Sequence, residues 1–158
     1  MRLLFVCTGN TCRSAMAEAL ARQVLAACGE TRVTVGSAGI AAPEGDPASA
    51  GARAAMAARG LTLEAHRARQ LTRAIAAQAD LILTMTDAHA QAVRALQPGA
   101  RVESLGQYAG IPGAVSDPYG GDAARYMACA DALAPLVTRA LARVRAESFG
   151  EGVPQAEA

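Results

Sequence analysis

The start of the chain constrains its fold most strongly, because an apolar run ends there at a thiol and a helical pattern follows. Residues 2–6 are mostly apolar and are typical of a buried parallel strand. Residues 14–28 carry apolar side chains at helical spacing. The segment between Cys7 and Ser14 therefore lies at a helix N-terminus, where free backbone N–H groups and the helix dipole favour a bound anion.

This segment holds side chains that suit phosphate chemistry, and we call residues 7–14 the phosphate loop. Its sequence is Cys7-Thr8-Gly9-Asn10-Thr11-Cys12-Arg13-Ser14. A helix N-terminus favours the thiolate form of a nearby cysteine such as Cys7. Arg13 offers a planar guanidinium that matches two phosphate oxygens, and the hydroxyl of Ser14 follows it. The alternative is a buried cysteine at a strand end beside a surface arginine. Neither glycine-rich nucleotide motif, G-x-x-x-x-G-K-[ST] or G-x-G-x-x-G, follows this strand.

Strands alternate with helices along the rest of the chain, which predicts a single three-layer α/β domain with a four-stranded parallel sheet. Further strands are expected at residues 33–35, 81–85 and 101–105, and further helices at residues 47–59, 88–96 and 122–147. We expect the last helix to be interrupted or bent near Pro135. The domain is expected to span residues 1–149, followed by a flexible tail at residues 150–158.

Five segments occur in an order that is known from one enzyme family. They are residues 4–14, Ser37-Ala38-Gly39, residues 66–71, residues 79–83 and Asp117-Pro118-Tyr119. On these segments the chain resembles the low molecular weight protein tyrosine phosphatase family, closest to its bacterial protein arginine phosphatase branch, over roughly residues 2–146. Ala15 stands where most members have proline, which loosens the helix start but removes no catalytic group.

Asp117 is the second residue with predicted chemistry, in the turn-like segment Asp117-Pro118-Tyr119-Gly120-Gly121. An Asp-Pro pair often does no more than begin a turn, and by itself this segment does not decide between a turn and an active-site loop. The family resemblance implies that Asp117 is the general acid, on a mobile loop that folds over the bound anion.

The resemblance also implies a mechanism in which Cys7, Arg13 and Asp117 are catalytic. Cys7 attacks phosphorus and forms a phosphocysteine, while Arg13 and the amides of residues 8–14 hold the phosphate oxygens. Neither a metal nor a cofactor is expected, and the cysteine spacing is a poor match for a metal site. The family pattern further places Asn10 at a strained loop corner, tied to the polar side chains of Ser14, Ser37 and His66. His89 receives no role.

Three positions bear on the substrate. The arginine-directed branch typically carries threonine at the position of Thr11, and a single aromatic residue with two glycines after the acid, as at Tyr119. Ile40 stands where both branches place an aromatic rim residue. These features favour phosphoarginine in proteins, with phosphotyrosine as the alternative, since Tyr119 also suits stacking on a phenyl ring. Phosphorylated proteins are the expected partners, and inorganic phosphate is the expected product and a competing ligand.

Cys12 lies in the same loop as Cys7, so a reversible disulfide between them is a candidate redox switch; the alternative is that Cys12 is only a small buried residue. A thiol-dependent arsenate reductase would need further cysteines where this chain has Thr84, Met85 and Thr86. A phosphate-binding module without turnover would need neither Cys7 nor Asp117. Both alternatives are therefore disfavoured.

Composition excludes other functions. The net charge is +1, and all fifteen basic residues are arginines without a concentrated basic stripe, so nucleic acid is not an expected partner. No apolar run suggests a membrane segment, and unpaired reactive cysteines suit the cytoplasm. The oligomeric state does not follow from the sequence.

Overall fold

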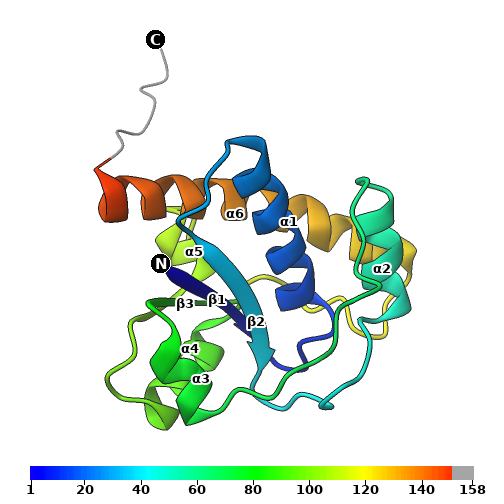
Figure 1. Cartoon of the computed structure of the whole chain (residues 1–158). Helices are drawn as coiled ribbons and strands as arrows, with labels where there is room; N and C mark the ends of the chain where they lie inside the picture. Colours follow the sequence, from blue (N-terminus) through cyan, green and yellow to red (C-terminus); the bar gives the residue numbers. More distant parts are fainter. Residues whose placement is uncertain (151–158) are drawn as a thin grey trace.

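The computed structural model describes residues 1–150 and contains one sheet of four parallel strands in the order β2-β1-β3-β4 (Figure 1). The strands are β1 (Arg2–Cys7), β2 (Thr34–Gly39), β3 (Leu81–Thr84) and β4 (Val102–Ser104). The helices are α1 (Arg13–Ala27), α2 (Ala50–Ala57), α3 (Arg73–Gln78), α4 (Asp87–Leu96), α5 (Leu105–Tyr108) and α6 (Ala123–Phe149). The predicted fold class is confirmed.

The side chains of β1 divide the core into two halves. Because successive residues of a strand point to opposite faces, Leu3, Phe5 and Cys7 face the layer that contains α1 and α6. Leu4 and Val6 face the other layer, with α3 and α4 (Figure 1). Burial on both faces explains why residues 3–7 are almost continuously apolar. The same alternation places the thiol of Cys7 on the α1 side of the sheet.

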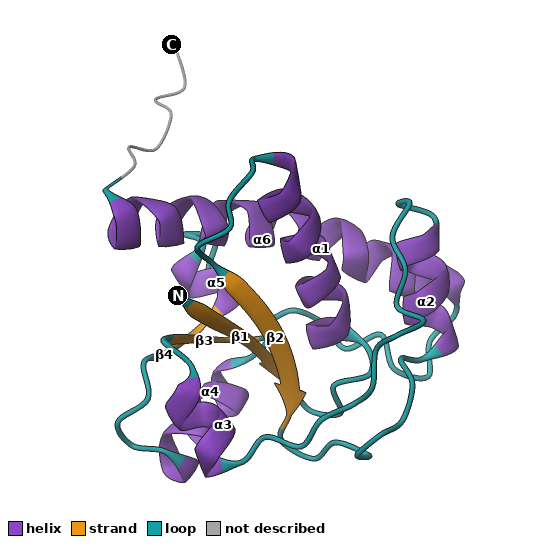
Figure 2. Cartoon of the chain, in the orientation of Figure 1, coloured by secondary structure: helices purple, strands orange, loops and turns teal. Residues whose placement is uncertain are grey.

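The order of the strands places the phosphate loop at a binding position. The chain passes from β1 to β2 on one side, and then to β3 on the other side of β1. Ligands of open α/β sheets bind beyond the carboxyl ends of the strands at such a switch point. Figure 2 shows loops gathered at this end of β1 and β2, and the phosphate loop is one of them.

Some predicted elements differ from the structure. The helix expected at residues 47–59 is the shorter α2, because the hydroxyl of Ser49 accepts a hydrogen bond from Ala52 N and begins the helix there. The short helices α3 and α5 were not predicted. The expected interruption at Pro135 is wrong, since α6 continues through it. Leu133 and Val137 on either side of the proline are fully buried, and their packing holds the helix together.

Two further predictions concern the chain as a whole. The predicted tail, residues 150–158, lies outside the described residues except for Gly150, the C-cap of α6. Within residues 1–150, no helix combines the length and the apolar character that crossing a membrane requires.

Candidate active site

The phosphate loop presents backbone donors that the protein itself does not use. Cys7 ends β1, and α1 begins after Cys12, its N-cap residue. Within the described part of the chain, the backbone N–H groups of Thr8, Gly9, Thr11 and Cys12 have no hydrogen-bond acceptor. Four such donors at the N-terminus of a 15-residue helix form a site for a tetrahedral anion.

Asn10 holds the corner of the loop. Its φ is +56°, in the left-handed region that asparagine tolerates better than most residues. Its Nδ2 donates to Ser14 Oγ at 2.8 Å, and its Oδ1 accepts from Arg69 N at 2.9 Å. His66 Nε2 donates to the carbonyl oxygen of Asn10 at 2.6 Å. The side chain of Asn10 is completely buried, so these bonds fix the loop from both sides.

Gly39, at the end of β2, allows the loop to lie close to the sheet. A Cβ atom at this position would be 2.5 Å from the carbonyl oxygen of Thr8 and 2.9 Å from the nitrogen of Asn10. Both neighbours are backbone atoms, which cannot rotate away. Only glycine fits here, and this explains the last residue of the Ser37-Ala38-Gly39 segment.

The sulfur of Cys7 lies within hydrogen-bond distance of two donors. Asn10 N donates to Cys7 Sγ at 3.3 Å, and Ser14 Oγ lies 2.9 Å from the same sulfur. Because Ser14 Oγ accepts from Asn10, its own proton is free to point at Cys7. The sulfur is therefore in contact with two donors in a buried position.

Arg13 connects the phosphate loop to the segment that carries the predicted acid. Its side chain is buried, and Nη1 donates to the carbonyl oxygen of Val115 at 3.0 Å. Nη2 lies 3.4 Å from Asp117 Oδ2, while the other carboxylate oxygen of Asp117 accepts from Tyr119 N at 3.0 Å. The carboxylate of Asp117 is half exposed. It therefore lies at the mouth of the site, within reach of a substrate.

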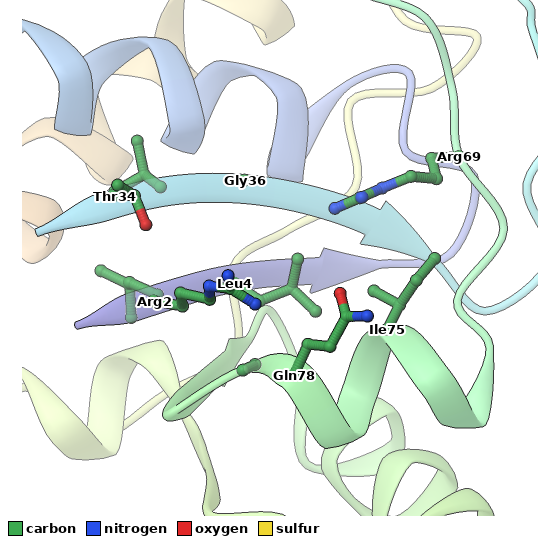
Figure 3. A pocket seen from close by; sticks show the side chains of 10 residues that line it. Arg2, Leu4, Thr34, Gly36, Arg69, Ile75 and Gln78 are labelled. Atoms are coloured by element: carbon green, nitrogen blue, oxygen red, sulfur yellow. The ribbon is translucent and has the colours of Figure 1, made fainter.

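A pocket of about 250 Å³ contains these groups. It is lined by Cys7, Thr8, Gly9, Thr11, Cys12, Arg13, Ala41, Pro43, Asp117 and Tyr119. Tyr119 is 74% exposed at the rim, and its ring contributes a surface on which a flat group can stack. A second hollow of about 290 Å³ lies between β2 and α3, where Arg2, Arg69 and Gln78 line it (Figure 3). It shares no residue with the pocket at the phosphate loop and contains no thiol.

Two residues of the predicted site, Ser37 and Ile40, differ from expectation. The hydroxyl of Ser37 is buried and has no hydrogen-bond partner within residues 1–150, so the expected tie to Asn10 is absent. Ile40 packs against the core, and Ala41 and Pro43 line the pocket instead. The carbonyl oxygen of Ile40 accepts a hydrogen bond from Gln70 Nε2 at 2.7 Å. The sulfur of Cys12 lies 3.2 Å from Ser49 Oγ and 3.5 Å from Tyr126 Oη.

The sequence analysis missed His89 and Tyr126, both of which contact the phosphate loop. His89 Nε2 lies 2.9 Å from Thr8 Oγ1. Burial is the largest effect on the pKa of Tyr126 and raises it, and the hydrogen bond to Cys12 raises it further. No local signal marks either residue, because each lies on a helix far along the chain from the loop that it contacts.

Comparisons with known proteins agree with this geometry. The family model described as low molecular weight phosphotyrosine protein phosphatase matches residues 2–149. A protein-arginine-phosphatase of Geobacillus stearothermophilus is 37% identical over 149 residues, which cover 92% of this chain and 97% of the relative. A probable low molecular weight protein-tyrosine-phosphatase, EpsP of Ralstonia solanacearum, is 42% identical over 134 residues, which cover 84% of this chain and 86% of the relative.

A solved structure has the same fold. It is a C7S mutant of YwlE arginine phosphatase with a phosphorylated active-site serine, and it superposes with a TM-score of 0.86 at 34% identity, covering 94% of this chain and 97% of the other. Family match and fold likeness therefore extend over nearly all of the described residues. The chain belongs to the low molecular weight phosphotyrosine protein phosphatase family, whose members are hydrolases.

Proposed function

We propose that this protein is a cysteine-dependent phosphatase that hydrolyses phosphorylated protein side chains through a phosphocysteine, with phosphoarginine preferred. The observation that carries the proposal is one pocket that combines a hydrogen-bonded thiol, unused backbone donors, a buried guanidinium and a half-exposed carboxylate. A thiol nucleophile, an oxyanion site and a proton donor are the groups that phosphoryl transfer through cysteine requires.

In the first step, the thiolate of Cys7 attacks phosphorus in line with the bond that breaks. The loop amides and the guanidinium of Arg13 hold the three equatorial oxygens, where the charge of the transition state resides. Asp117 protonates the departing nitrogen or oxygen. In the solved YwlE relative a serine replaces the cysteine of the active site and is phosphorylated, which supports a covalent intermediate at this position.

In the second step, Asp117 is ionised and takes a proton from the attacking water. The water oxygen bonds to phosphorus, the bond from phosphorus to sulfur breaks, and inorganic phosphate leaves. The Ser14 hydroxyl, 2.9 Å from Cys7 Sγ, stabilises the thiolate that departs. Each step uses residues that line the pocket or directly support its loop.

Two lines of support favour phosphoarginine. Thr11 lines the pocket, and we infer that its branched side chain narrows the pocket and its hydroxyl makes it more polar. Two protein-arginine-phosphatases, 37% and 40% identical, match most of this chain. The exposed ring of Tyr119 and the EpsP relatives instead support phosphotyrosine, which is the second candidate.

The test compares phosphate release from a phosphoarginine peptide and a phosphotyrosine peptide under reducing conditions. The intact protein, Cys7→Ser and Thr11→Ile are assayed side by side. We expect Cys7→Ser to abolish release and Thr11→Ile to move the kcat/KM ratio at least about tenfold toward phosphotyrosine, since a larger apolar side chain replaces a polar one. A phosphotyrosine preference of the intact protein would establish the second candidate. Absence of release that depends on Cys7 from either peptide would refute both.

We also propose that the protein is cytoplasmic. We propose further that oxidation of Cys7 is trapped as a disulfide with Cys12. All four cysteines are free in the structure, and Cys12 is buried beside Cys7 in the phosphate loop. Peptide mass spectrometry after mild peroxide treatment is expected to find these two residues linked. In the control variant Cys12→Ser, we expect no such disulfide and oxidation of Cys7 to sulfinic acid instead.

A further inference from the structure

The contact between His89 and Thr8 joins α4 to the wall of the pocket. His89 Nε2 and Thr8 Oγ1 are 2.9 Å apart, although the two residues are separated by 81 positions in the sequence. His89 is 8% exposed, whereas Thr8 is exposed and lines the pocket. The carbonyl of Thr8 also accepts from Ala41 N at 2.9 Å. Backbone and side chain of Thr8 are thus both held in place.

The arrangement of donors determines which ring nitrogen carries the proton. Nδ1 of His89 is buried and has no hydrogen-bond partner within residues 1–150. A proton there would be a buried donor without an acceptor, which is unfavourable. The proton therefore belongs on Nε2, which donates to Thr8 Oγ1. One lone pair of Thr8 Oγ1 and its hydroxyl proton then remain available to a ligand in the pocket.

The ring of His89 is neutral at neutral pH. Burial is the main cause that lowers its pKa, and the guanidinium of Arg13, on α1, lowers it further. The carboxylate of Asp117, on the acid segment, opposes this shift. Asp87 is the other charged group nearby in sequence, on the same helix as His89. A neutral ring adds no positive charge that would repel a guanidinium group in the pocket.

We propose that His89 is a positioning residue for substrate selectivity, which holds the Thr8 hydroxyl where its lone pair accepts an N–H of a phosphoarginine side chain. The inference rests on the phosphatase function proposed above. The phenyl ring of phosphotyrosine presents no hydrogen-bond donor to the Thr8 hydroxyl. His89 and Thr8 together therefore discriminate between the two candidate substrates. A pocket that provides a hydrogen bond to one substrate disfavours an analogue that lacks the matching group.

The kinetic test uses isosteric and rescuing variants. Thr8→Val is expected to lower the ratio of kcat/KM for the phosphoarginine peptide to kcat/KM for the phosphotyrosine peptide about tenfold, as for one hydrogen bond to a charged group. His89→Phe gives the same pattern, and His89→Gln restores activity because its amide donates in place of Nε2–H. The double variant Thr8→Val with His89→Phe loses no more than Thr8→Val alone. Gln91→Ala, exposed on the same helix, is the control.

Two further arms separate this inference from the proposed function. Nitrogen NMR of the ring, assigned with His89→Gln in a chain of only two histidines, is expected to show the Nε2–H tautomer. Calorimetric binding of both peptides to Cys7→Ser, with and without the Thr8 and His89 changes, reports selectivity without turnover. Equal losses for both peptides, additive effects in the double variant, or a proton on Nδ1 would overturn the role of His89. Absence of turnover would refute the phosphatase, and the binding arm would still decide the inference.

Discussion

Asn10 shows how one residue stabilises a catalytic loop. It is the only residue other than glycine with a positive φ between residues 1 and 150. Its side chain satisfies one backbone donor, at Arg69, and one side-chain acceptor, at Ser14. The Ser14 hydroxyl thereby directs its proton at Cys7. Backbone strain and buried hydrogen bonds thus act at the same position, where the loop has to curve around an anion.

Replacing Asn10 separates these two contributions. Asn10→Ala is expected to lower the free energy of unfolding by about 2 kcal/mol, from a strained φ and from the loss of the acceptor for the partly buried Arg69 N–H. Asn10→Gly relieves the strain but does not restore the lost hydrogen bonds. This variant should therefore be about 1 kcal/mol more stable than Asn10→Ala. Urea denaturation measures both. Equal stability of the two variants would show that the positive φ carries no cost.

At the scale of elements, α6 tolerates a proline in its interior. Pro135 has no N–H, so the carbonyl of Asp131 loses its helical donor. Both residues are exposed, and water can satisfy that carbonyl. The buried side chains of α6 pack against α1 and α2, and this packing outweighs the local cost.

Pro135→Ala is therefore expected to stabilise the protein. Restoring the hydrogen bond and relieving the clash should raise the free energy of unfolding by about 2 kcal/mol, after allowing for the stiffer unfolded chain that proline provides. Thr138→Ala, at another exposed position of α6, is the control and should change stability by less than about 0.7 kcal/mol. The measurement is the unfolding midpoint in denaturant. A Pro135→Ala variant no more stable than the intact protein would show that α6 already accommodates the proline without cost.

For the whole molecule, two glutamates tie the C-terminal end of α6 to the rest of the fold. Glu147 pairs with Arg101 and Arg143 and accepts from the Tyr108 hydroxyl. These partners, Arg101 first, lower the pKa of Glu147 to about 2. Glu30, whose side chain is almost completely buried, accepts hydrogen bonds from Arg32 and one from Arg145 of α6. The hydrogen bonds from Arg32 are the main cause that lowers its pKa to about 2.

These shifts predict how stability depends on pH. Each carboxyl has an ordinary pKa of 4.5 when unfolded and about 2 when folded, so the unfolded chain binds more protons between these values. The contribution of each group is complete above pH 4.5 and is lost as the pH falls toward 2. Glu147→Gln is expected to flatten the fall of stability with pH in this window, and Glu64→Gln, at an exposed side chain, is the control. Urea denaturation at several pH values measures this; parallel curves for the intact protein and Glu147→Gln would contradict it.

Local patterns predicted much of the fold, and distant contacts explain the misses. The β1–α1 unit follows from apolar spacing and from the loop between them, because both signals lie within a few residues. The helix α3 has six residues and begins at a Thr72 side-chain cap, too short for a periodic signal. The residue type at Ser37 matched the family pattern, yet its hydroxyl has no hydrogen-bond partner within residues 1–150. Ile40, which stands where the family pattern has an aromatic rim residue, packs against the core and does not line the pocket. The directions of these two side chains depend on packing against distant parts of the chain, which a local sequence pattern does not reveal.

The sequence by itself determined the parallel α/β class, the phosphate loop between Cys7 and Ser14, and the kind of chemistry that the loop supports. Periodicity, helix dipoles and loop residues act over short distances, so they can be read locally. Only the tertiary structure decided that Arg13 bonds to the Val115 carbonyl, 102 positions away, and that His89 contacts Thr8 across 81. These contacts form because helices and loops from distant parts of the chain pack at one end of the sheet, and that packing is a property of the whole fold.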